Sequence, residues 1–517
     1  MPIRRRFFFL CFFFISPILI QADAPDFPAP APDATAYDFL GAQMQKSIAD
    51  LDWGGGQVAI LIEDGAVPLK VFGMNEKASL QPGPLMQIVT AAAALERLGP
   101  DFTFHTDLAL AGPIEKGTLA GDLIVRGDGD PSLSSFLLKR PEDAYGLFDR
   151  WAKLLRKHKC QRVQGRVIGD GRAFDNVAQA PGWLTGKLGP PEYPSIAALS
   201  FNDNCVDIYW KKGRKEGPAE FELFPRLPKY VFFASNVRRA ALPRADRHYE
   251  RPAEGNVISA LGELPLGTEA HERASIENPE RFFAEAFKAR LAERKIAVQG
   301  AAVSGTSLSP GEIPEQSTLL DRQASPALAD LLGRMMRYDQ TLSAEVALKT
   351  MGRKATGKPG SFQSGAEAVE QFLDGFHLPG SAPLVADGSG RSSADRLSAV
   401  LLVDLTRRML RGLRAKAFEG LFPRAGEPGI LAERFQPFKP AAAAQGKKKK
   451  EPVREPPRIW AKAASTEGVE GLAGWVRTRS GRRLIFAMMV NGSTMPPPAL
   501  RAQLDALALD LADSVVQ

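Results

Sequence analysis

A serine followed three residues later by a lysine could perform nucleophilic catalysis. One helical turn places the amine on the same face as the hydroxyl, where it can take the proton. No serine in the chain has a lysine at this spacing. Ser389 lies in the glycine-rich stretch Asp387–Gly390, which favours a turn. Ser200-Phe201-Asn202 pairs a serine with an amide, and we interpret it as turn and strand-end hydrogen bonding. The serines therefore lack an evident base.

The sequence also lacks the spacing of histidine and cysteine residues that is typical of metal sites. The five histidines occur without H-x-x-x-H spacing, and no C-x-x-C is present; they are His105, His158, His248, His271 and His377. We expect no metal and no other cofactor. A disulfide between Cys160 and Cys205 is chemically permitted in an oxidising compartment, and two separately buried thiols fit the spacing equally well.

The first residues have the pattern of an export signal. Arg4–Arg6 precede the apolar run Phe7–Ile20, and Ala22-Asp23-Ala24 supplies small residues for cleavage. We predict a signal peptide over residues 1–24 and a periplasmic location. The apolar run is shorter than the ~20 residues of a spanning helix, so no transmembrane anchor is expected after cleavage. Residues 25–36, rich in proline and alanine, are predicted to be a linker.

The charge of the chain is modest. The formal net charge of +7 falls to +5 once the three arginines and one aspartate of residues 1–24 are removed. No aromatic residues are interleaved with basic ones, so we expect no nucleic-acid partner. Lys447–Lys450 lie between an alanine run and several prolines, and residues 441–457 are predicted to be a flexible low-complexity loop.

Candidate elements open with strand, strand and helix. Gln57–Glu63 and Val67–Phe72 flank Asp64-Gly65, a hairpin signal. Leu85–Leu98 is predicted to be a helix that follows Pro84 and ends at Gly99-Pro100. Short apolar runs divided by Gly, Pro and Asp predict a β-rich insertion over 102–310. The later segments comprise helical texture at Ser325–Met351, a hairpin of Leu472–Thr478 with Arg483–Val490, and a helix from Leu500.

Five stretches carry a family resemblance: Gln81–Leu108, Gly121–Leu133, Pro181–Ile208, Ala386–Ser398 and Glu470–Gly492. In this order they resemble the D-alanyl-D-alanine carboxypeptidase/endopeptidase family, the class C low-molecular-weight penicillin-binding proteins. The resemblance implies a multi-domain α/β chain. It implies a penicillin-binding-protein-like serine peptidase domain, formed by residues 37–101 plus 311–517 and interrupted by one or more inserted β-rich domains at 102–310.

The same resemblance implies three motifs in one cleft, S-x-x-K, S-x-N and K-T-G. Aligned without gaps, the first motif has Pro84 in place of the nucleophile and Gln87 in place of the lysine. Asp339, Gln340 and Thr341 stand at S-x-N, and the third motif keeps Lys462 but has alanines at positions 463 and 464. We predict no catalytic residue. The vestigial cleft positions are expected to be Pro84, Gln87, Asp339, Thr341 and Lys462.

The expected function is that of a catalytically inactive periplasmic homologue. It would bind a peptidoglycan stem peptide or a cell-envelope protein, or act as a scaffold. The alternative is an active serine-type carboxypeptidase/endopeptidase of peptidoglycan metabolism that uses other residues. Lys462 is the candidate ligand-binding cation for a terminal carboxylate, although it could equally be a solvated side chain on a strand beside a closed cleft. Asp339 would repel such a carboxylate.

Overall fold

The structure is a computed structural model of the whole chain, and it describes residues 34–183, 189–241, 245–252, 254–376, 382–435 and 457–516. The predicted signal peptide lies outside these residues, as do most of the linker and all but the last residue of the predicted loop 441–457. Helix α1 spans Ala34–Ala49, so helical structure begins inside the predicted linker.

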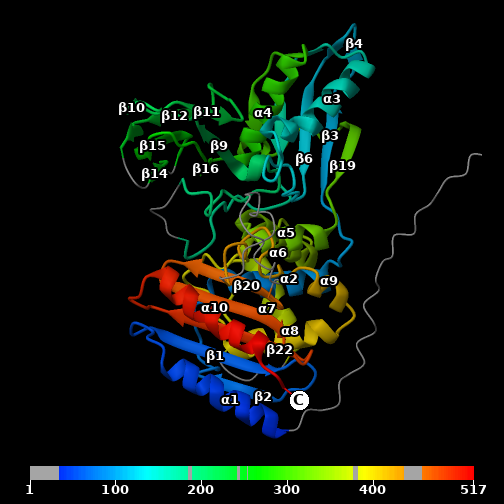
Figure 1. Cartoon of the computed structure of the whole chain (residues 1–517). Coiled ribbons are helices and arrows are strands. Elements are labelled where there is room, and N and C mark those ends of the chain that lie inside the picture. Colours follow the sequence, from blue (N-terminus) through cyan, green and yellow to red (C-terminus); the bar gives the residue numbers. More distant parts are fainter. Residues whose placement is uncertain are drawn as a thin grey trace, which may run out of the picture.

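A five-stranded antiparallel sheet joins the two ends of the chain, in the order β2-β1-β22-β21-β20 (Figure 1). Its strands are β1 (Gln57–Asp64), β2 (Lys70–Met74), β20 (Ile459–Thr466), β21 (Val469–Arg477) and β22 (Arg483–Asn491). β1 and β22 are apolar and buried almost throughout, which is typical of central strands covered on both faces. Their pairing runs from Gln57 opposite Asn491 to Asp64 opposite Leu484.

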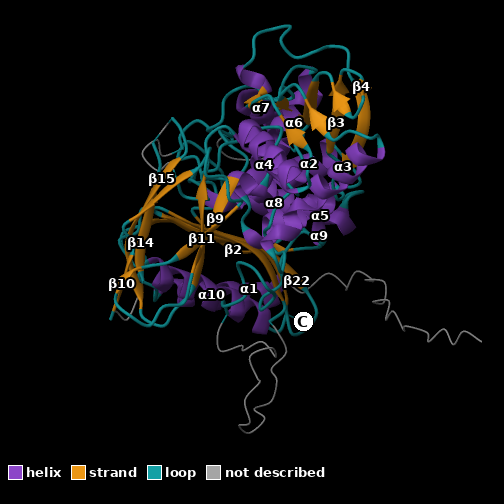
Figure 2. Ribbon diagram, turned by 90° about the horizontal axis from the view of Figure 1, so that it is seen from above, coloured by secondary structure: helices purple, strands orange, loops and turns teal. Residues whose placement is uncertain are grey.

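Helices cover both faces of this sheet (Figure 2). α1 and α10 (Pro497–Asp513) pack with one face, and the remaining helices of this part form a core with the other. These are α2 (Met86–Arg97), α5 (Leu328–Tyr338), α6 (Thr341–Thr356), α7 (Phe362–Asp374), α8 (Ala399–Arg411) and α9 (Ala415–Glu419). Gly41 lets α1 lie directly on edge strand β2, since a Cβ at that position would be 2.5 Å from the Val71 carbonyl oxygen.

The inserted region forms the upper body in Figure 1. It carries two long helices as well as strands: α3 (Gly146–Lys157) and α4 (Pro279–Glu293). The strands are β3 (His105–Ala111), β4 (Ile114–Glu115), β5 (Thr118–Leu119), β6 (Asp122–Gly127), β7 (Arg162–Val163), β8 (Val167–Asp170), β9 (Cys205–Trp210), β10 (Gly217–Pro218), β11 (Phe221–Phe224), β12 (Phe232–Ser235), β13 (Arg238–Ala240), β14 (Asp246–Glu250), β15 (Val257–Pro265), β16 (Ala270–Ser275), β17 (Ala297–Val298), β18 (Ala302–Ser304) and β19 (Thr318–Ala324).

One predicted boundary differs from the structure. β19 falls within the range 311–517 assigned to the peptidase-like part, but it pairs with β3 of the insertion. The sheet of the insertion therefore ends at Ala324, and the chain returns to the other body only with α5.

The cysteines do not form the disulfide that the sequence permitted, because Cys160 and Cys205 are both buried free thiols. The Cys160 Sγ donates to the carbonyl of Arg162, and the Cys205 Sγ donates to the carbonyl of Asp203. Each thiol is thus satisfied locally.

Candidate active-site cleft

Pro84 lies in a short 3-10 turn, Gly83–Leu85, directly before α2, and it is fully buried. The preceding residue, Gly83, has a φ of +53°, and a Cβ there would be 3.1 Å from Val469 at the β20–β21 hairpin. Glycine therefore lets this turn sit against the hairpin. Gln87 follows in the first turn of α2, with its side chain also fully buried.

Asp339 and Thr341 lie at the junction of α5 and α6. Asp339 ends α5 in the left-handed conformation, with a φ of +57°, which aspartate tolerates better than most residues. Thr341 opens α6, and its buried Oγ1 has no hydrogen-bond partner among the described residues. Lys462 lies opposite Ala473 in edge strand β20.

These elements bring four side chains into one network centred on the Asp339 carboxylate. Gln87 Nε2 and Lys462 Nζ each donate to Asp339 Oδ1 at 2.7 Å. Arg391 donates to Asp339 Oδ2 at 2.6 Å. Lys462 also reaches the Met336 carbonyl at 3.4 Å. The first, second and third motif positions therefore contact one another in the folded chain.

Two cations, Lys462 and Arg391, surround one carboxylate in this network. Burial tends to raise the pKa of Asp339, but the Lys462 ammonium and the Arg391 guanidinium hold that pKa below its usual value. Burial lowers the pKa of Lys462, and the Asp339 carboxylate opposes this shift. Lys462 is completely buried, whereas the Asp339 side chain is 20 % exposed. The Lys462 ammonium and the Arg391 guanidinium are thus both paired with the Asp339 carboxylate.

A turn behind the network positions Arg391. The Asp387 carboxylate accepts hydrogen bonds from the backbone N–H groups of Gly390 and Ser392, at 2.6 and 2.7 Å, and from Trp183 Nε1 at 2.7 Å. Glu345 on α6 accepts from the N–H groups of Gly388 and Ser389, at 2.8 and 2.9 Å. Hydrogen bonds from backbone N–H groups therefore fix the path of the chain through the turn that precedes Arg391.

Further carboxyl groups are buried at this turn. Burial, reinforced by the charge of Asp387, raises the pKa of Glu345 well above its ordinary value. The pKa of Asp395 is raised well above its ordinary value by the same two causes. Burial and the neighbouring Asp387 carboxylate therefore disfavour the ionised forms of Glu345 and Asp395.

Two sequence-based readings of the cleft need correction. Lys462 is not a solvated side chain, because it is buried in an ion pair. Asp339 is not an isolated negative charge facing the cleft, because Lys462 and Arg391 neutralise it. Nothing in the motif spacing indicated Arg391, which follows the Asp387–Gly390 turn. The need of a partly buried Asp339 for a cationic partner is the signal that could have suggested an arginine.

The serines considered as alternatives have structural contacts. Ser389 is fully buried, and its hydroxyl lies 3.4 Å from an Asp387 oxygen, with no lysine in contact. Ser200 donates to the Ala197 carbonyl, and Asn202 contacts Cys205 and Asp207 within the insertion. Among the described residues, neither serine hydroxyl is hydrogen-bonded to a lysine or a histidine.

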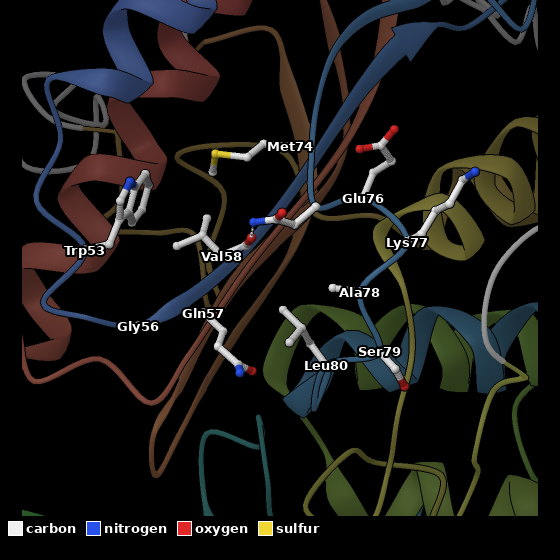
Figure 3. A pocket seen from close by; sticks show the side chains of 11 residues that line it. Trp53, Gly56, Gln57, Val58, Met74, Glu76, Lys77, Ala78, Ser79 and Leu80 are labelled. Atoms are coloured by element: carbon white, nitrogen blue, oxygen red, sulfur yellow. Dashed lines mark hydrogen bonds between the residues drawn. The ribbon is translucent and has the colours of Figure 1, made fainter.

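Two cavities lie in the peptidase-like part of the chain. One, of about 740 Å³, adjoins Asp339 and is lined by Ala463 and Ser465 of β20 and by Arg501 and Asp505 of α10. The other, of about 800 Å³, lies beside Trp53, Met74 and Leu80 (Figure 3). In the second cavity Ser79 and Lys77 point in opposite directions, so they form no serine–amine pair.

No group of three or more His, Cys, Asp or Glu side chains within the described ranges is arranged to hold a metal ion. Within the same ranges, no helix combines the length and the apolar character needed to cross a bilayer.

Solved structures define the class of fold. Penicillin binding protein 4 (dacB) from Haemophilus influenzae superimposes with a TM-score of 0.75 at 21% sequence identity, covering 91% of this chain and 99% of that one. The architecture is thus that of a penicillin-binding protein with an inserted region.

Sequence comparison then identifies the family. The D-Ala-D-Ala carboxypeptidase 3 (S13) family matches residues 40–511, and the chain belongs to this family. It is 25% identical to the D-alanyl-D-alanine carboxypeptidase of Actinomadura sp. (strain R39), over 92% of this chain and 86% of the relative. It is also 25% identical to D-alanyl-D-alanine carboxypeptidase DacB of Haemophilus influenzae, over 78% of this chain and 79% of the relative. The predicted family and α/β multi-domain fold are therefore confirmed.

Proposed function

We propose that the protein is a periplasmic, non-catalytic member of this family that associates with peptidoglycan. The observation that carries the proposal is the Asp339 network. Gln87 stands where the family lysine would take a proton, and it hydrogen-bonds Asp339. Lys462 is committed to the same carboxylate. Pro84 supplies no nucleophile, so the covalent route through a serine is absent at this position.

Release of D-alanine tests the absence of catalysis. The protein is incubated with a pentapeptide stem ending in D-Ala-D-Ala, with the Haemophilus influenzae carboxypeptidase as the positive control. We expect no D-alanine above the buffer blank. Release that depends on protein concentration would instead support an active carboxypeptidase/endopeptidase.

Association with the wall is tested separately, because binding needs no nucleophile. The cavity beside Asp339 offers space along the edge of β20 for a peptide. We expect the protein to cosediment with purified sacculi, and Ala463→Trp, which fills this cavity, to reduce the bound fraction. Val257→Trp, on an exposed position of β15, is the matched control and should bind normally. Equal binding by both variants would show that the protein binds sacculi through a surface outside the cleft, and it would favour the scaffold role.

A further inference from the structure

Four chain segments meet at one end of the five-stranded sheet. The β21–β22 turn contacts the β1–β2 turn, because the Gly65 N–H donates to the Arg483 carbonyl at 2.8 Å. The end of α8 joins them, since Arg411 donates to the Ala66 carbonyl at 2.9 Å. The C-terminal residues follow, with the Val516 N–H donating to Ser480 Oγ at 3.1 Å.

This end, which we call the basic end, concentrates positive charge. Its eight cations are Arg407, Arg408, Arg411, Arg414, Lys416, Arg479, Arg482 and Arg483. The carboxylates paired with them are five: Glu63, Asp64, Asp404, Glu419 and Asp513. Among the described residues, no carboxylate lies within the 4.0 Å ion-pair distance of Arg411, Arg414 or Lys416. Eight cations therefore face five ion-paired carboxylates, and Arg411, Arg414 and Lys416 are the three without a carboxylate partner among the described residues.

Apolar side chains project among these cations. Leu413, between Arg411 and Arg414, is fully exposed. Val67 is exposed and follows Ala66, whose carbonyl accepts from Arg411. Val515 is also exposed and precedes Val516, whose N–H donates to Ser480. A single exposed aliphatic residue is ordinary on a protein surface. Three of them interspersed with arginines form the pattern of a membrane-surface contact, in which apolar groups enter the interface between basic groups that face phosphates.

The chain also enters the fold at this end. Tyr37, in the first turn of α1, donates a hydrogen bond to Asp64, which lies 3.9 Å from Arg482. In Figure 1 the start of α1, the C-terminus, α8 and α9 lie on the same side of the lower body.

We propose that the basic end docks on the surface of an anionic phospholipid bilayer. Arginine guanidinium groups bind headgroup phosphates, and Leu413, Val67 and Val515 enter the interfacial region. A soluble polyanion would engage the cations but leave these aliphatic side chains in water, which favours the bilayer. This surface is separate from the cleft, and its role does not depend on the proposed loss of catalysis.

Vesicle cosedimentation tests the proposal, using the protein without residues 1–24, a removal that touches no described residue. The vesicles contain phosphatidylcholine alone or mixed with phosphatidylglycerol. We expect binding to the mixed vesicles only, weakened by salt. Arg411→Glu with Arg414→Glu should reduce binding by roughly 25-fold or more, since each basic side chain near such a surface contributes about a factor of five. Leu413→Asp should reduce it about tenfold.

The controls are Arg140→Glu and Leu319→Asp, exposed positions in the insertion that should leave vesicle binding unchanged. Urea denaturation confirms that every variant is folded. Unchanged binding by the basic-end variants, equal loss in the controls, or equal binding to neutral vesicles would each overturn the proposal. Binding to inorganic polyphosphate without binding to mixed vesicles would overturn it as well, by identifying a soluble polyanion as the ligand.

Discussion

Asp339, in the cleft, and Asp387, in the turn that precedes Arg391, accept hydrogen bonds from different kinds of donor. Asp339 accepts hydrogen bonds from the side chains of Gln87, Lys462 and Arg391, which come from three other segments. Asp387 accepts from two backbone N–H groups and one tryptophan. Side-chain partners can be exchanged without moving the chain, whereas main-chain partners fix its path. This difference predicts that substitutions in the Asp339 network disturb the chain less than substitutions at Asp387.

The largest effect is expected at the turn. Asp387→Ala leaves the N–H groups of Gly390 and Ser392 and the Trp183 indole without their acceptor. Because each hydrogen bond to a charged group contributes roughly 1.5–3 kcal/mol, we expect a loss of about 4 kcal/mol or more in the free energy of unfolding, measured by urea denaturation. A loss below about 1 kcal/mol would show that the turn does not depend on this carboxylate.

Replacing Asp339 should lower the free energy of unfolding almost as much as replacing Asp387. A second substitution, at one of its partners, should restore part of that loss. Asp339→Ala leaves Lys462 buried without a counter-charge and should cost about 3 kcal/mol. Adding Lys462→Met removes the fully buried charge and should recover part of that loss, because Arg391, whose side chain is 9 % exposed, still lacks its partner. No recovery in the double variant, measured by the same denaturation, would contradict a network made of exchangeable side chains.

The pH dependence of stability should have opposite signs in the two regions. The folded pKa of Asp339 is lowered, so its contribution is present above its unfolded pKa of about 4 and is lost as the pH falls through the folded pKa. The folded pKa of Glu345 is raised, so its contribution is present below its unfolded pKa of about 4.3 and is lost as the pH rises through the folded pKa.

Denaturation between pH 3 and 8 measures both slopes. The stability difference between the wild type and Asp339→Asn should shrink as the pH falls below about 4. The free energy of unfolding of Glu345→Gln, relative to that of the wild type, should increase as the pH rises toward neutrality. Parallel curves for the two variants would contradict the contrast between the regions.

The smallest effect is expected for Ser389→Ala. The Ser389 hydroxyl has long hydrogen bonds, at 3.4 Å, with an Asp387 oxygen and with the Arg391 N–H. Its removal should change the free energy of unfolding by less than about 1 kcal/mol. A drop of several kcal/mol in urea denaturation would give this serine a structural role that its contacts do not indicate.

Sequence reasoning predicted the family and the hairpins at both ends, and both are confirmed. The loss of the catalytic motifs stays a prediction. These predictions follow from local patterns, such as the Asp64-Gly65 turn and the fixed spacing of Pro84 and Gln87. It missed the role of Arg391 and misjudged the setting of Lys462, because side-chain pairing depends on the approach of segments far apart in the chain. β19 was assigned to the wrong body for the same reason: a seven-residue strand does not indicate which sheet it joins.

Intact-mass spectrometry after incubation with a β-lactam tests the central claim most directly, because acylation requires an activated nucleophile. The family carboxypeptidase of Haemophilus influenzae serves as the positive control. We predict that the mass of this protein stays unchanged while the control gains one adduct. A stoichiometric adduct on any serine peptide of this chain would contradict the account.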